Sequence, residues 1–221
     1  MAVFDFTPAV LMERVMMIIP TVLSLSVHEW AHAWSAHKLG DDTAAREGRL
    51  TLNPASHIDP IGTLLLPLLG IPFGWAKPVP VNPARFRRGV HMGTGMAITA
   101  SAGPISNLIL SFFCAVTLGL MFRLAPQLID SQPGIVKLLM FGIQLNIGLA
   151  VFNLLPIPPL DGSRIVERFI PYSMRHTWER FQSLAPVLLL VVIATGGFIL
   201  AAPLGYMTVL MLNVLRTVAG A

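Results

Sequence analysis

Four long runs that almost lack charged residues constrain the fold of this chain more than any other feature. Three of them contain no charged residue, and the fourth contains only Glu29. Their lengths are 23, 31, 23 and 35 residues, and they lie between Arg14 and Lys38, His91 and Arg123, Lys137 and Asp161, and Arg180 and Arg216. A helix that crosses a bilayer needs about 20 predominantly apolar residues. The runs therefore predict an all-α polytopic membrane protein with about four to five transmembrane helices.

Composition excludes the other broad classes. Hydrophobic residues make up 54% of the 221 residues and charged residues 12%, about half the charge of a typical globular protein. Such a chain is too apolar to be disordered, and the single Cys114 excludes a disulfide scaffold. The net charge of +4 is dispersed, so no nucleic-acid partner is expected. The N-terminus has no basic region ahead of its first apolar run, which argues against a cleaved signal peptide.

We expect one domain, 1–221, and place the spans by charge and by helix-breaking residues. The predicted spans cover about 12–38, 92–123, 137–160 and 182–203. Pro203 and Gly205 are the expected break in the last run. Whether the helix expected over 204–219 spans the membrane or lies on it is left open.

The segment 59–77 differs from these spans. Prolines and glycines interrupt its uncharged residues, which favours a re-entrant or interfacial segment, since irregular backbone at membrane depth must be covered by protein or water. The flanking stretches 40–57 and 76–90 are polar and are predicted to be loops, with room for short strands around 49–52 and 79–81.

Positive charges set the expected orientation. Two regions, one following the first span and one following the third, hold eleven of the fifteen Lys and Arg residues. They lie on the same side of the membrane if 59–77 does not cross it. Because basic loops stay in the cytoplasm, we expect these regions inside, the N-terminus outside, and a multi-pass location in the cell membrane.

The first span carries an H-E-x-x-H motif, with its ionisable residues at His28, Glu29 and His32. Residues i and i+4 of a helix share a face, so the two imidazoles can bind one zinc ion with the glutamate beside it as a base. Ionisable groups in a membrane span cost roughly 3 kcal/mol each, so they usually serve a function. His32 lies about 9 Å of helix rise from Lys38, which places the site toward the cytoplasmic side.

A catalytic zinc site usually has three protein ligands, so one ligand is missing. The remaining candidates are Asp41, Asp42, Asp59, Asp130, Asp161, Glu167, His37, His57, His91 and His176. Asp161 is favoured because it follows three helix-breaking prolines at the end of the third run, on the side expected for the histidines. An ordinary Asp-Gly turn is the alternative.

These motifs resemble the site-2 protease family of intramembrane zinc metalloproteases. The H-E-x-x-H helix matches, as does an N-x-x-P-x-x-x-x-D-G motif at 153–162 and a G-P-x-x-N motif at 103–107. Residues 39–41, 48–54 and 76–83 resemble the short prokaryotic members, which carry no PDZ or CBS domain. The motifs together span residues 28 to 162.

The resemblance implies one zinc ion per chain, held by His28, His32 and Asp161, with Glu29 as the general base. The implied substrate is a transmembrane segment of another protein, in contact with membrane lipid, and a homo-oligomer is left open. Asn107 is expected either to bind substrate or the oxyanion, or to hydrogen-bond between helices. His57 is expected to assist catalysis, to bind substrate or metal, or to be bonded locally.

Two other functions fit part of the pattern. A metal transporter would use the intramembrane histidines and aspartate as a relay, but the second and fourth runs carry no charge. A catalytically inactive family member would usually have a damaged motif, whereas Glu29 and the three expected ligands are present here. The motifs therefore favour a zinc-dependent intramembrane endopeptidase.

Overall fold

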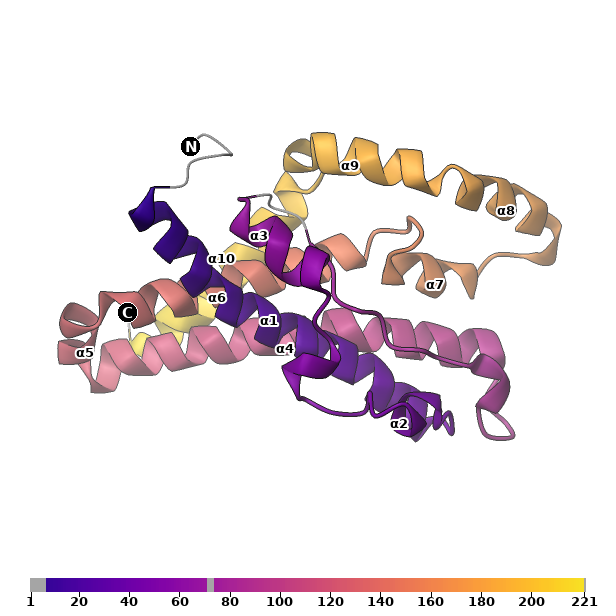
Figure 1. The fold of residues 1–221 in the computed structure, drawn as a ribbon, viewed down its shortest axis with the longest axis horizontal. Coiled ribbons are helices and arrows are strands. Elements are labelled where there is room, and N and C mark those ends of the chain that lie inside the picture. Colours follow the sequence, from indigo (N-terminus) through magenta and orange to yellow (C-terminus); the bar gives the residue numbers. More distant parts are fainter. Residues whose placement is uncertain (1–6, 71–73, 221) are drawn as a thin grey trace.

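The uncharged runs form the long helices of the computed structural model, which describes residues 7–70 and 74–220 (Figure 1). Within these ranges, four helices are long and apolar enough to cross a membrane: α1 (Pro8–Lys38), α4 (Met92–Leu124), α6 (Pro133–Asn153) and α10 (Ala201–Ala219). The prediction of a polytopic α-helical membrane protein is confirmed.

The predicted span 182–203 differs from the structure. Most of its residues divide between α9 (Ala185–Ile199) and the start of α10, with the break at Leu200. Pro203 does not break the chain because it lies in the first turn of α10, where backbone N–H groups have no partner within the helix. The helix α8 (Arg175–Ser183), extended back to Tyr172, and the segment Ala185–Thr195 form a pair bent by 60°, which makes a fifth span if the pair crosses as one.

The third span is also shorter than the predicted 137–160. Helix α6 ends at Asn153, and turns follow up to Leu160. Pro156, Pro158 and Pro159 lack the N–H that an α-helix needs. The shorter elements are α2 (Thr43–Arg46), η1 (Pro54–Ser56), η2 (Pro60–Leu65), α3 (Leu66–Leu68), η3 (Pro83–Arg85), α5 (Pro126–Ser131), α7 (Asp161–Glu167) and η4 (Tyr172–Met174).

The short strands allowed for around 49–52 and 79–81 do not form in the described residues. Residues 75–82 are irregular, and several of their backbone groups bond to side chains rather than to another strand. Arg49 donates to the carbonyls of Lys77 and Pro78 at 2.6 and 3.2 Å, and Asp41 accepts from the N–H of Asn82 at 2.6 Å. We name residues 75–82 the anchored segment.

The segment predicted to be re-entrant or interfacial, 59–77, begins with the π-helical turn η2 and the short helix α3. The carboxylate of Asp59 starts this turn by accepting from the N–H groups of Ile61 and Gly62. Residues 71–73 lie outside the described residues. Insertion of this segment into the membrane stays a prediction.

Helix α4 is the centre of the bundle and packs against α1, α6, α7 and α10. Small residues allow close approach, as is common between membrane helices. A Cβ at Gly119 would lie 2.7 Å from the carbonyl oxygen of Leu215 on α10, and one at Gly142 would lie 3.1 Å from the sulfur of Cys114. The apolar core combines α4, α6 and α10 through Ala115, Ile143, Ile147 and Met211.

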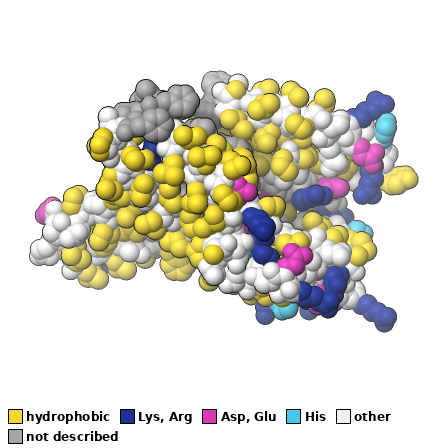
Figure 2. Space-filling view, in the orientation of Figure 1, with side chains coloured by type: hydrophobic (Ala, Val, Ile, Leu, Met, Phe, Trp, Pro, Cys, Tyr) yellow, Lys and Arg dark blue, Asp and Glu magenta, His cyan; other side chains and the backbone are white. Residues whose placement is uncertain are grey.

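The two basic regions lie at one end of the bundle. The N–H of Arg87 donates to the carbonyl of Leu39 at 2.8 Å, and Arg168 donates to Thr94 at the start of α4. Most Lys and Arg side chains visible in Figure 2 gather toward its right-hand end, and hydrophobic side chains cover much of the rest of that face. A shared side of the membrane would require this arrangement, and the sidedness itself stays a prediction.

Candidate metal centre

The H-E-x-x-H motif lies in the second half of α1, so its two histidines are one helical turn apart. Both side chains are buried, and their Nε2 atoms are 3.1 Å from each other. Trp30 and Trp34, in the same stretch, stack on each other with ring centroids 5.9 Å apart. The helix thus presents two imidazole nitrogens at one point inside the bundle.

The third group comes from the turn that follows α6. Asp161 is the first residue of α7, and its Oδ2 lies 3.3 Å from the Nε2 atoms of both His28 and His32. Gly162 permits this path because a Cβ there would overlap the carbonyl oxygens of Leu154 and Leu155. In the D-G pair, Asp161 supplies the carboxylate, and Gly162 is required because the backbone packs too closely there for a side chain.

These three atoms have the spacing of a zinc site. Tetrahedral ligands at 2.0–2.1 Å from zinc lie about 3.3 Å from one another, and the observed separations are 3.1, 3.3 and 3.3 Å. Asp161 Oδ2 is buried and has no hydrogen-bond donor in the described part of the chain. A carboxyl group ordinarily loses its proton near pH 4, so Asp161 can offer an anionic, metal-binding oxygen at neutral pH.

Both imidazoles are held through their other ring nitrogen. His28 Nδ1 lies 2.6 Å from Asn107 Oδ1, and His32 Nδ1 lies 2.7 Å from the carbonyl oxygen of Thr99. Both partners are acceptors, so each imidazole donates from Nδ1 and keeps its Nε2 lone pair for a metal. Such outer hydrogen bonds fix the tautomer and orientation of metal-binding histidines.

Asn107 belongs to a buried polar network among three helices. Its Nδ2 donates to Asn146 Oδ1 on α6 at 2.8 Å, and Asn146 donates to Ser24 Oγ on α1 at 3.0 Å. The expected hydrogen bonding between helices is therefore present. Because the amide of Asn107 is already bonded to protein partners, its geometry favours orienting His28, and the substrate-binding role stays a prediction.

Gly103, the first residue of the G-P-x-x-N motif, packs against the histidine pair. A Cβ at this position would lie 2.5 Å from His32 Nε2 and 2.6 Å from His28 Cε1. Glycine therefore leaves the space that the two imidazoles occupy, and Asn107 lies one turn further along the same face of α4.

Glu29 lies beside the ligand pair and is half-buried. Its Oε2 accepts a hydrogen bond from the N–H of Val79 at 2.8 Å, which places the anchored segment next to the metal centre. The backbone of the anchored segment thus holds the carboxylate, and the ligand cluster among the described residues consists of His28, His32 and Asp161.

His57 lies outside the ligand cluster. It is buried, its Nε2 donates to the carbonyl of Thr51 at 2.8 Å, and its own carbonyl accepts from the N–H of Lys77 at 2.9 Å. These contacts agree with a locally bonded histidine that helps hold the anchored segment. A role with substrate stays a prediction.

Sequence reasoning missed Thr99 and the contact between Val79 and Glu29. Both act through backbone atoms, so side-chain chemistry gave no signal. The sequence showed Gly103 only as part of a motif. That this position must lack a Cβ depends on how α4 packs against α1.

A helical membrane protein with this converging His-His-Asp centre has the construction of a membrane metalloprotease, and comparison with known proteins agrees. The model of peptidase family M50 matches residues 126–195, which include Asp161. The chain is 42% identical over 187 residues to the Bacillus subtilis protein YwhC, which is named as a zinc metalloprotease, and the match covers 83% of each chain.

More distant relatives carry similar names. Rip2 of Mycobacterium tuberculosis, also named as a zinc metalloprotease, is 30% identical over 177 residues, 80% of this chain and 66% of Rip2. MJ0611 of Methanocaldococcus jannaschii is 38% identical over 68 residues, 31% of each chain. No solved structure matched. The chain belongs to peptidase family M50, the site-2 protease family, which confirms the resemblance seen in the motifs.

Proposed function

We propose that this protein is a zinc-dependent intramembrane endopeptidase that cleaves transmembrane segments of other membrane proteins. The observation that carries the proposal is the convergence of His28, His32 and Asp161 within 3.1–3.3 Å, on a helix of membrane-spanning length. The zinc metalloprotease names of the relatives support the choice of metal.

The three side chains supply two imidazole nitrogens and one carboxylate oxygen, a donor set that suits zinc and leaves one position open for substrate. When bound, zinc lowers the pKa of water and polarises the scissile carbonyl. Asn107 and the Thr99 carbonyl hold the two imidazoles in the tautomer that such a site needs.

Glu29 is the general base of the proposed reaction. Its carboxylate accepts the proton of the attacking water and returns it to the nitrogen of the leaving amine. The hydrogen bond from the Val79 N–H fixes one carboxylate oxygen, so the other is available for the proton. The anchored segment thereby orients the base.

The position of the site supports the proposed substrate class. Both histidines are buried in the second half of α1, among membrane-length helices. A helical substrate must unwind before attack, because its peptide carbonyls are bonded within the helix. We propose that the site opens toward the cytoplasmic side, where the basic regions are expected, and that the N-terminus is extracytoplasmic.

The two alternatives are less well supported. A transporter would use the histidines as a relay, and it would not explain why the relatives are named as zinc metalloproteases. An inactive family member needs a defect, yet the three ligands and Glu29 are present in one arrangement.

The decisive experiment compares wild type, Glu29→Gln and the control Glu47→Gln, a substitution of an exposed glutamate. Zinc content and cleavage of a model transmembrane substrate are measured on each purified protein. We expect one zinc ion per chain in all three and cleavage in all but Glu29→Gln. Cleavage by Glu29→Gln at the wild-type rate would refute the role of the base, and a wild type without zinc would refute the metalloprotease assignment.

A further inference from the structure

The surface beside α1 and α4 carries an apolar groove that the proposed reaction does not use. It has a volume of about 940 Å³ and is lined mainly by Trp30 and Trp34 from α1, by Ile98, Ile105 and Ile109 from α4, and by Phe169. Trp34, the three isoleucines and Phe169 are exposed, by 45 to 76%. On membrane-spanning helices, such side chains face lipid.

The polar side chains in the groove wall are already bonded within the protein. The hydroxyls of Ser35, Ser101 and Ser106 each donate to a backbone carbonyl of their own helix. Thr94 Oγ1 accepts from Arg168 Nε at 2.7 Å. An unwound peptide would therefore find few partners for its backbone here, whereas hydrocarbon chains need none.

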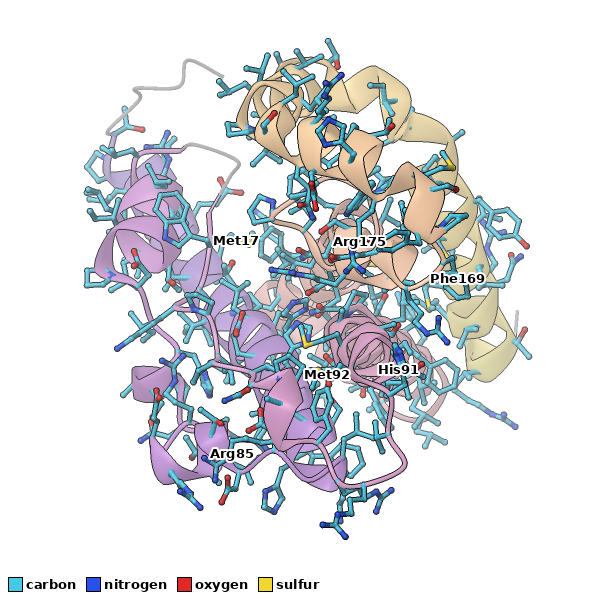
Figure 3. All side chains as sticks on the ribbon, turned by 90° about the vertical axis from the view of Figure 1, so that its right-hand side faces the viewer. Met17, Arg85, His91, Met92, Phe169 and Arg175 are labelled. Carbon is cyan, nitrogen blue, oxygen red and sulfur yellow. The ribbon has the colours of Figure 1, made fainter. Side chains whose placement is uncertain are left out.

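A second cavity, with charged residues in its wall, adjoins the groove at Arg168. Its volume is about 630 Å³, and Arg168 lines both spaces. The cavity is lined also by Arg164, Arg175 and His91, with Glu167 as the acidic residue. Figure 3 looks onto this end and shows Arg175 on α8 facing the start of α4, where His91 and Met92 lie.

Two donors in this cavity lack acceptors. Arg175 forms no ion pair within the part of the chain that the structure describes. The indole Nε1 of Trp178, another lining residue, is buried and has no hydrogen-bond partner among the described residues. Arg164 is paired with Glu167 only at 3.5 Å. The cavity thus has an excess of positive charge and unfilled donors, which suits a phosphate group.

We propose that the groove and the cavity together bind one anionic phospholipid. Its acyl chains lie against Trp30, Trp34 and the isoleucines of α4, and its phosphate lies among Arg164, Arg168 and Arg175. The arrangement of the two spaces supports a phospholipid. The apolar groove suits its acyl chains, the charged cavity suits its phosphate, and the two spaces meet at Arg168. The aromatic residues fit as well, since tryptophan favours the membrane interface. Binding does not depend on the proposed protease activity.

The test uses tryptophan fluorescence of the intact protein in lipid nanodiscs. Three of the four tryptophans, Trp30, Trp34 and Trp178, line the two spaces, so brominated acyl chains bound there quench most of the emission. Brominated phosphatidylglycerol is titrated against brominated phosphatidylcholine. The Glu29→Gln protein serves as the parent for all variants, which excludes self-cleavage.

We expect phosphatidylglycerol to quench at a lower mole fraction than phosphatidylcholine. Each arginine near an anionic lipid contributes about five-fold to affinity. Arg168→Gln with Arg175→Gln should therefore reduce the preference about 25-fold, while lysine at both positions should retain part of it. Arg216→Gln is the matched control, because this exposed arginine lies near the far end of α10.

Four results would overturn the proposal. They are equal quenching by both lipids, a preference unchanged in the double glutamine variant, an equal loss in Arg216→Gln, and displacement of the bound lipid by inorganic phosphate alone. If lipid preference is unchanged while KM for a transmembrane substrate rises when the same double substitution is made in the active wild-type protein, the groove binds substrate and the lipid assignment is wrong. Unchanged thermal unfolding of each variant shows that it is folded.

Discussion

Replacing Gly103 by alanine tests the metal centre at the point where packing is tightest. The new Cβ would lie 2.5 Å from His32 Nε2 and 2.6 Å from His28 Cε1. Ordinary contact begins at 3.4 Å, so the imidazoles must retreat by roughly 0.9 Å. Metal-ligand distances tolerate about 0.2 Å. The displacement is therefore several times what the three-atom arrangement can absorb.

We expect zinc affinity to fall by at least about 100-fold in Gly103→Ala, more than the loss of a single outer hydrogen bond causes. The helix itself gains from the change, because alanine is favoured over glycine by about 1 kcal/mol in a helix interior. Loss of zinc together with retained helicity distinguishes a local steric effect from unfolding.

The assay is competition for zinc between the purified protein and a chelator of known affinity, with thermal unfolding measured in parallel. Gly148→Ala is the matched control, because this glycine of α6 has no atom within 4 Å of a built Cβ. Wild-type zinc affinity in Gly103→Ala would show that the histidines have room to move and that the reasoning is wrong.

Three further outcomes are expected. Asn107→Ala removes the acceptor that orients His28 and should weaken zinc binding 10- to 100-fold. Asn107→Asp should restore part of the affinity. Chelator competition that finds both variants equal to wild type would contradict this role. Arg49→Met frees the Lys77 carbonyl and should lower cleavage at constant zinc content; a parallel loss of zinc would argue against a role confined to the anchored segment. A reporter fused after Arg88 should read as cytoplasmic, and an extracytoplasmic signal would overturn the proposed topology.

The long helices could be predicted because each needs only a run of apolar residues free of charge. The helix ends were harder. Prolines correctly signalled the end of the third run, but the helix stops at Asn153 because an N–H is already lacking at Pro156. The last run was divided wrongly, since Pro203 is harmless in a first turn and hydropathy carries no signal for the break at Leu200.

The strands allowed for near 49–52 and 79–81 are absent from the described residues, because backbone groups there form hydrogen bonds with side chains and not with a neighbouring strand. A buried arginine and a buried aspartate, Arg49 and Asp41, bond to the backbone of the anchored segment. The sequence leaves room for extended segments here, but only the fold shows whether a neighbouring strand or a side chain bonds to their backbone.

The sequence by itself determined the membrane class, the two histidines on one helix face, Glu29 beside them, and Asp161 as the favoured third ligand. These follow from hydropathy and from spacing within single segments. Only the tertiary structure decided how Asp161 meets the histidines, that Asn107 and Thr99 orient them, and that Gly103 must lack a side chain. Those contacts join residues 67 to 133 positions apart. Their distances depend on how closely α1, α4 and α6 pack, which no local pattern encodes.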